Sequence, residues 1–82
     1  MPMFPSFLAA AEAAHRVAAA YGLPADMFYT CSLSGGWRPV VYCADNAAIV
    51  AALGDAVTWS TVDDKRYARA VVDGVEFTGK AE

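Results

Sequence analysis

A two-residue turn near the C-terminus constrains the fold of this chain more than any other feature. Asp73-Gly74 lies between two runs rich in β-branched and aromatic residues, "RYARAVV" and "VEFTG". Asp-Gly favours the tight turn between antiparallel strands, because both residue types tolerate a positive φ. The turn therefore predicts a hairpin of fixed register, and the register decides which side chains share a face. The facing pairs on the predicted buried side are Val72 with Val75 and Ala70 with Phe77.

The opposite face of this hairpin has a mixed aromatic and charged character. Residues alternate between the two faces of a strand, so the second face collects every other residue of both runs. Such a face suits water or a binding partner better than a core. Its members are Tyr67, Arg69, Val71, Glu76, Thr78 and Lys80.

Apolar spacing and capping signals predict two helices. The first covers residues 6–21, with Ser6 as its N-cap and with Gly22 and Pro24 ending it. Its expected apolar face consists of Phe7, Ala10, Ala11, Ala14, Val17, Ala18 and Tyr21. The second helix covers residues 46–53, between an Asp45 cap and Gly54, with Ile49, Val50 and Leu53 as its apolar stripe.

Three further strands are predicted at residues 27–34, at residues 37–43 and in "AVTWSTV". The order along the chain is then helix, strand, strand, helix, strand, strand and short strand. This order predicts an α+β fold, in which both helices cover one face of an antiparallel sheet of four to five strands. A chain of 82 residues without a linker predicts a single compact domain, 1–82.

Charge and composition narrow the classes of function. The formal net charge is -3 and the acids are scattered, which argues against binding to a nucleic-acid backbone. The apolar N-terminal stretch contains Glu12, His15 and Arg16 and lacks a basic leader, so we expect no membrane span and a cytoplasmic protein. An apolar fraction of 57 % on so small a body favours an exposed patch for a partner or for self-association.

The two cysteines, Cys31 and Cys43, allow two interpretations that depend on the register of the first hairpin. A two-residue turn at Gly35-Gly36 places them on opposite faces of the sheet. A three-residue loop at residues 36–38 makes them face each other, and a cross-strand disulfide then becomes feasible. A zinc site would need a fuller ligand set than these two cysteines and the single His15, so no metal is expected. Two small buried hydrophobic residues are the simpler interpretation.

The chain contains no convincing triad, metal set or cofactor loop, so we expect a non-enzymatic protein without a cofactor that binds another protein. Tryptophan, tyrosine and arginine dominate the binding energy of protein interfaces. The expected anchors are Trp37, Arg38, Tyr67 and Arg69, and the acids expected to meet basic residues of a partner are Asp63, Asp64 and Glu76. Trp59, in the third strand, is expected to be buried, and Asp63-Asp64 is expected to form a solvated turn.

In size, acidity and lack of catalytic residues, the chain resembles the small acidic accessory proteins of phages and mobile elements, among which are the anti-CRISPR proteins. That group shares no residue pattern, so no site residue is carried over from it. The resemblance implies a steric inhibitor in a bacterial host, which occupies a nucleic-acid-binding groove on a Cas effector subunit or another host protein. The alternatives are a homodimeric structural or small-ligand-binding module and a weak oligonucleotide binder; the chain could be a monomer or a homodimer.

Overall fold

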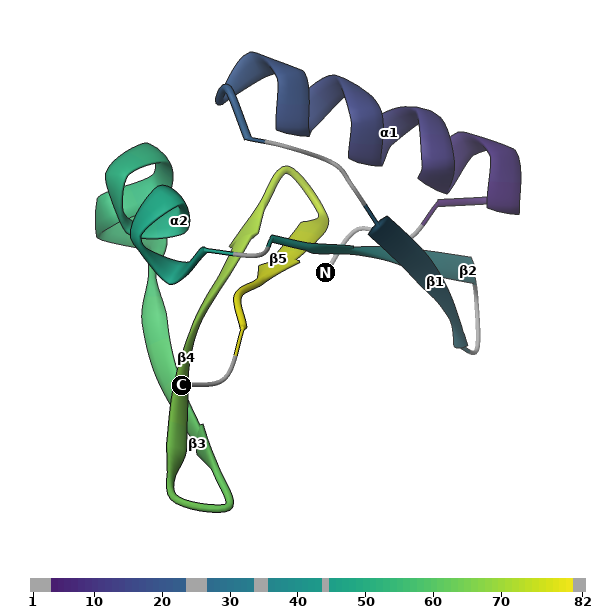
Figure 1. Cartoon of the computed structure of the whole chain (residues 1–82). Coiled ribbons are helices and arrows are strands. Elements are labelled where there is room, and N and C mark those ends of the chain that lie inside the picture. The colour runs from purple at the N-terminus through teal and green to yellow at the C-terminus, as the bar shows by residue number, and fades with distance from the viewer. Residues whose placement is uncertain (1–3, 24–26, 34–35, 44, 81–82) are drawn as a thin grey trace.

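Within the residues that the computed structural model describes (4–23, 27–33, 36–43 and 45–80), two helices and five strands follow the predicted order, with a 3-10 turn added (Figure 1). The elements are α1 (Phe7–Ala20), β1 (Met27–Leu33), β2 (Gly36–Tyr42), α2 (Asn46–Leu53), η1 (Gly54–Ala56), β3 (Thr58–Val62), β4 (Lys65–Val72) and β5 (Val75–Thr78). The α+β class predicted from the sequence is therefore confirmed.

The ends of α1 are fixed by local signals that the sequence carries. The Ser6 Oγ accepts a hydrogen bond from the Ala9 N–H at 3.1 Å, as an N-cap does. At the other end, Gly22 adopts a φ of 69° and the Leu23 N–H donates to the Ala18 carbonyl at 2.9 Å. This bond is typical of a Schellman motif, which requires a left-handed residue after the helix. Ser6 and Tyr21, the first and last residues of the predicted stretch, are the N-cap and the C-cap of the helix.

The buried stripes of the helices differ in part from the predicted ones. Asp45 caps α2 by accepting the Ala47 N–H at 2.8 Å, and Ile49 and Leu53 are buried as predicted, but Val50 is exposed. On α1, Phe7 and Tyr21 are exposed and Ala11 is only half-buried, although all three were predicted for the apolar face. The residues of α1 that are buried are Ala10, Ala13, Ala14, Val17 and Ala18.

The sheet is mixed, which corrects the prediction of a purely antiparallel one. Its strand order is β1-β2-β5-β4-β3, and the central strand, β5, is parallel to its neighbour β2. The β4–β5 hairpin has the register that Asp73-Gly74 predicted, with Ala70 opposite Phe77. Local turns specify antiparallel hairpins only, whereas the β2–β5 pair joins segments more than thirty residues apart. No short-range signal could therefore predict that pair.

Both predicted registers of the first hairpin are wrong. Leu33 pairs with Gly36, and Cys31 lies opposite Arg38 and not opposite Cys43 or Val40. Cys43 follows Arg38 by five residues, which corresponds to about 16 Å along a strand, whereas a disulfide requires Cα atoms within about 7 Å. The cross-strand disulfide, which was the alternative interpretation, is therefore incompatible with this register. Cys43 is buried and forms no disulfide, and the side chain of Cys31 lies outside the described part of the structure.

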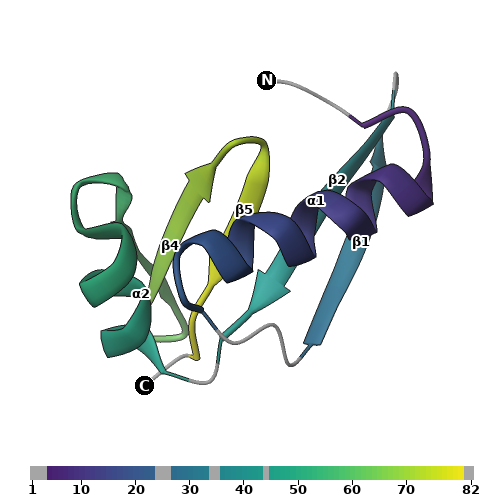
Figure 2. The same cartoon turned by 90° about the horizontal axis from the view of Figure 1, so that it is seen from above.

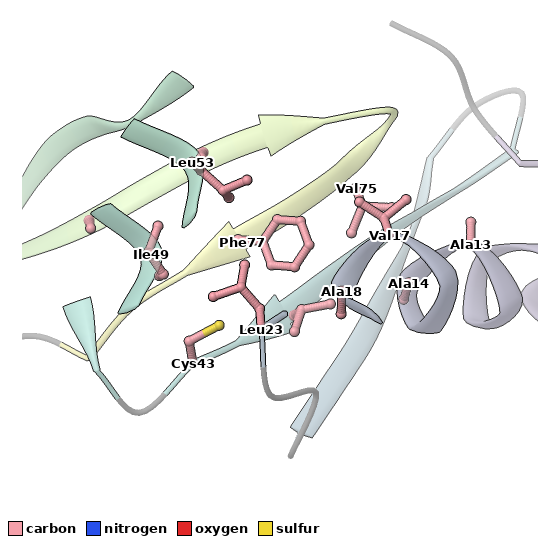
Figure 3. Close-up of a cluster of buried hydrophobic side chains, with 13 residues drawn as sticks. Ala13, Ala14, Val17, Ala18, Leu23, Cys43, Ile49, Leu53, Val75 and Phe77 are labelled. Atoms are coloured by element: carbon pink, nitrogen blue, oxygen red, sulfur yellow. The ribbon is translucent and has the colours of Figure 1, made fainter. Parts of the chain in front are cut away.

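One hydrophobic cluster joins both helices to the same face of the sheet. Figure 2 shows α1 in front of β5 and β2, with α2 beside β4. Phe77, fully buried, lies in this cluster between Ile49 of α2 and Val17 of α1 (Figure 3). Among the described helices, none is long and apolar enough to cross a membrane.

Candidate functional site: the β3–β4 ribbon and the outer sheet face

The four residue pairs of the β3–β4 hairpin that are nearest its turn extend beyond the rest of the sheet. Arg69 of β4 pairs with Thr58 on one side and with Thr78, the last residue of β5, on the other. Past this point the ladder joins β4 only to β3, apart from the Gly79 N–H, which donates to the Ala68 carbonyl, and we call residues 59–68 the β3–β4 ribbon. Figure 1 shows it pointing away from both helices. At about 3.3 Å per residue, four pairs project roughly 13 Å.

The tip of the ribbon is the exposed Asp63-Asp64 turn, as predicted. Asp63 and Asp64 have φ values of 51° and 64°, and Val62 pairs with Lys65 across them. Two consecutive positive φ angles define the type I′ turn, whose twist matches that of the strands. Aspartate tolerates this conformation better than most residues with a side chain. The turn therefore holds two carboxylates at the most protruding point of the ribbon.

Trp59 lies on the ribbon face that continues the helix-covered side of the sheet. It is 46 % exposed, and the Arg66 guanidinium carbon lies 4.5 Å from its ring centroid. A cation over an indole ring at this distance is a favourable cation–π contact. The predicted burial of Trp59 is wrong, because the ribbon extends past the helices that could have covered it. The sequence gives no sign of this pair, because a tryptophan in a strand is usually buried.

The face opposite the helices, here the outer face, has a buried carboxylate at its centre. Glu76 is only 7 % exposed, and its Oε1 lies 2.7 Å from Arg69 Nη2 and 4.0 Å from Arg38 Nη2. Thr78 Oγ1 donates to Glu76 Oε2 at 3.2 Å. Burial by itself raises the pKa of Glu76, but the hydrogen bond and charge of Arg69, with help from Arg38 and Thr78, lower it overall. The carboxylate is thus held ionised between two arginines.

Four of the seven residues expected to bind a partner share the outer face, and two others lie at the ribbon tip, away from these four. Register places Arg38, Tyr67, Arg69 and Glu76 on the outer face, which continues into the ribbon, and Asp63 and Asp64 lie at the ribbon tip. Trp37 is separate from them. It faces α1, where its ring makes an edge contact with Phe7 at a centroid distance of 5.9 Å.

Asn46, which the sequence analysis did not single out, attaches the base of the ribbon to α2. Its Oδ1 accepts the Ala68 N–H at 3.1 Å, and its Nδ2 donates to the Lys80 carbonyl at 2.8 Å. Gly79 lies so close that a Cβ there would overlap the Asn46 side-chain oxygen. Asn46 is only 5 % exposed, so these bonds satisfy a buried amide and fix where the ribbon leaves the core. The Asp45-Asn46 helix start gave no sign of this long-range contact.

A shallow pocket of about 380 Å³ lies elsewhere on the described surface. It lies between the end of α1, the α2–η1 segment and β4, where Tyr21, Leu53, Asp55 and Val72 contribute to its lining. General acid–base chemistry requires groups paired within hydrogen-bond reach of a substrate, and the lining provides Asp55 as its one carboxylate. Among the described residues, no group of three or more His, Cys, Asp and Glu side chains could hold a metal ion.

Comparisons of this chain with protein-family models, with curated proteins and with solved structures found no match.

Proposed function

We propose that this chain is a non-enzymatic binding protein that docks on another protein through the β3–β4 ribbon. In its specific form, the proposal is a steric inhibitor of the anti-CRISPR kind, which blocks a nucleic-acid-binding groove on a Cas effector subunit or another host protein. The observation that carries the proposal is the Trp59–Arg66 pair, which is half exposed on a ribbon that no helix covers.

The energetics of the ribbon support a binding role. A two-stranded ribbon buries little apolar surface and is at best marginally stable by itself. An exposed tryptophan there adds little to folding, but tryptophan and arginine are the residue types most enriched among interface hot spots. Trp59 and Arg66 are already held against each other, so less conformational freedom is lost when a partner binds.

Charge supports a partner with a basic groove. The molecule carries a formal net charge of -3, and the ribbon presents Asp63 and Asp64 at its tip, followed on β4 by exposed Lys65 and Arg66. Complementary charge mainly increases the association rate and the specificity of a complex, and added salt screens it. We therefore expect the complex to weaken as salt concentration rises. Oligonucleotide binding through Tyr67 and Arg69 is not favoured, since Arg69 is bonded to the Glu76 carboxylate.

A pull-down from a bacterial lysate tests the proposal. Tagged wild type, Trp59→Ala and Leu8→Ala are compared by mass spectrometry, and affinities for the recovered partner are then measured. Leu8 is a matched control, because it is a large exposed apolar residue on α1, away from the ribbon. We expect Trp59→Ala to weaken binding about 30-fold, as loss of a hot spot of ~2 kcal/mol does, and Leu8→Ala to leave it unchanged. Equal binding by both variants, or the absence of a stoichiometric partner, would contradict the proposal.

A further inference from the structure

We propose that the open edge of β3 accepts an extended segment of the partner protein as a sixth strand, and that this segment carries basic residues at its ends. The inference rests on the proposed function and specifies the chemistry of the partner. Three observations support it: the direction of the backbone groups of β3, the composition of β3 and the charges at its two ends.

The backbone of β3 directs hydrogen-bonding groups away from the sheet. Both backbone groups of Ala68, which pairs with Trp59, are engaged elsewhere: its N–H donates to Asn46, and its carbonyl accepts the Gly79 N–H at 2.8 Å. Trp59 and Ala68 are therefore a non-hydrogen-bonded pair of the antiparallel ladder. The N–H and carbonyl of Trp59, and by alternation those of Thr61, consequently point to the open side of β3.

The composition of β3 does not protect this edge. Natural edge strands usually avoid pairing with other chains by means of an inward-pointing charge, a lysine, a proline or a bulge. The sequence of β3, TWSTV, contains no charged residue and no proline, and β3 pairs with β4 through all five of its residues without a bulge. Trp59 and Val62, which are 46 % and 52 % exposed, flank the edge on opposite faces and would contact alternate side chains of an added strand.

The charges at the ends of β3 favour one kind of added strand. Asp55 precedes the strand, and Asp63 and Asp64 follow it; all three are exposed. The basic residues of the ribbon region, Lys65, Arg66 and Arg69, all lie on β4, one strand further in. Lys65 is exposed and pairs with Val62, Arg66 covers Trp59, and Arg69 is bonded to Glu76. A second copy of this chain would bring acid against acid in either strand direction. A strand with lysine or arginine at both ends would instead meet opposite charges, which favours a basic segment of another protein.

Proline substitution at Thr61 tests pairing at the open edge of β3 without changing the rest of the fold. Because the Thr61 N–H points outward, Thr61→Pro removes a donor from the open edge and leaves the pairing with β4 intact, which is where strands tolerate proline. Thr61→Val is the matched control, since it keeps the N–H and removes only the hydroxyl group. The probes are two capped synthetic peptides, Lys-Thr-Val-Thr-Val-Thr-Lys and its counterpart with glutamate at both ends. Each is titrated into isotope-labelled protein, and amide resonances are followed by NMR.

We expect the basic peptide to shift the Trp59 and Thr61 amide resonances and the glutamate-ended peptide to bind at least tenfold more weakly. Thr61→Pro should abolish the response to the basic peptide, and Thr61→Val should retain it. Any of four results would overturn the inference. These are equal binding of both peptides, shifts confined to other residues, no shift at millimolar peptide, and an unchanged response of Thr61→Pro. If Thr61→Pro disorders the ribbon, hydrogen exchange on wild type decides: the basic peptide must slow exchange at the Trp59 and Thr61 amides, and unchanged rates would refute strand addition.

Two further outcomes distinguish this inference from the proposed function. A recovered partner that Trp59→Ala loses and Thr61→Pro retains would overturn strand addition and leave the proposed function standing. Binding of the basic peptide at the β3 edge, with no partner recovered from the lysate, would support strand addition at this edge and count against the proposed function.

Sedimentation tests the identity of the occupant. A wild-type dimer that Thr61→Pro converts to a monomer would identify a second copy as the occupant and overturn the choice of a basic segment.

Discussion

The helix-covered part of the sheet and the β3–β4 ribbon are built from similar hairpins but are stabilised differently. Each hairpin closes with a two-residue turn whose residues have positive φ, Asp73-Gly74 in one and Asp63-Asp64 in the other. The first hairpin faces the helices and includes fully buried Phe77, whereas residues 59–67 of the second include no buried residue. Burial therefore stabilises one region, and ladder hydrogen bonds with a few side-chain contacts order the other. This leaves the exposed side chains of the ribbon available for binding.

The largest expected effect is a difference in the free energy of unfolding between one substitution in the helix-covered sheet and one in the ribbon. Phe77→Ala removes a fully buried aromatic side chain and should lower the free energy of unfolding by about 3–5 kcal/mol. Trp59→Ala removes an even larger side chain, but one that is half exposed, and should change the free energy of unfolding by only about 0.5 kcal/mol. Urea denaturation measures both values. Similar losses of stability in the two variants would contradict the conclusion that burial stabilises only the helix-covered region.

Asn46→Ala tests whether the ribbon depends on its attachment to α2. The substitution leaves the Ala68 N–H and the Lys80 carbonyl without their side-chain partner and should cost about 1–3 kcal/mol of stability. Amide exchange in the ribbon should accelerate more than exchange in β5. Ser6→Ala is the control, because it also removes a side-chain-to-backbone bond but at the far end of α1. Equal acceleration in the ribbon for both variants would contradict the attachment role.

Glu76, which lies on the outer face near the ribbon, should make the free energy of unfolding depend on pH. Its pKa in the folded state is lowered below the ordinary value of 4.5. Its ionised form therefore adds stability that is fully present above pH 4.5 and is lost as pH falls through the lower folded-state pKa. At pH 7, Glu76→Gln should be less stable than wild type by about 1–3 kcal/mol, and this difference should shrink below pH 4.5. Glu12→Gln, at an exposed glutamate of α1, is the control; a Glu76→Gln difference that stays constant down to pH 3 would refute the role of the ion pair.

The smallest effect should come from making the two turns alike. Asp64→Gly converts Asp63-Asp64 into the Asp-Gly sequence of the other hairpin. Because Asp64 has a φ of 64°, glycine relieves backbone strain and should raise the free energy of unfolding by about 0.5–1 kcal/mol. Thermal unfolding measures the change, with Asp55→Gly, an exposed aspartate outside the turn, as the control. A loss of stability in Asp64→Gly would show that the aspartate side chain supports the turn.

The candidate site could be predicted in part from the sequence. Alternation along "RYARAVV" and "VEFTG" placed Tyr67, Arg69 and Glu76 on one face, and the structure agrees. The projection of the ribbon could not be predicted, because it depends on where β5 ends relative to β4 and on which part of the sheet the helices cover. For the same reason, the exposure of Trp59 and the contact of Asn46 with Ala68 were missed.

The sequence by itself determined the features that depend on interactions over a few residues. These are the bounds of α2, the caps of α1 to within one residue, and the β4–β5 register, since caps and tight turns act locally. The tertiary structure decided the parallel β2–β5 pair, the register of the β1–β2 hairpin and the separation of Cys31 from Cys43. Those features depend on which segments bury Phe77 and Val41 together beneath both helices. Burial of this kind is shared among segments far apart in the chain, so no local pattern specifies it.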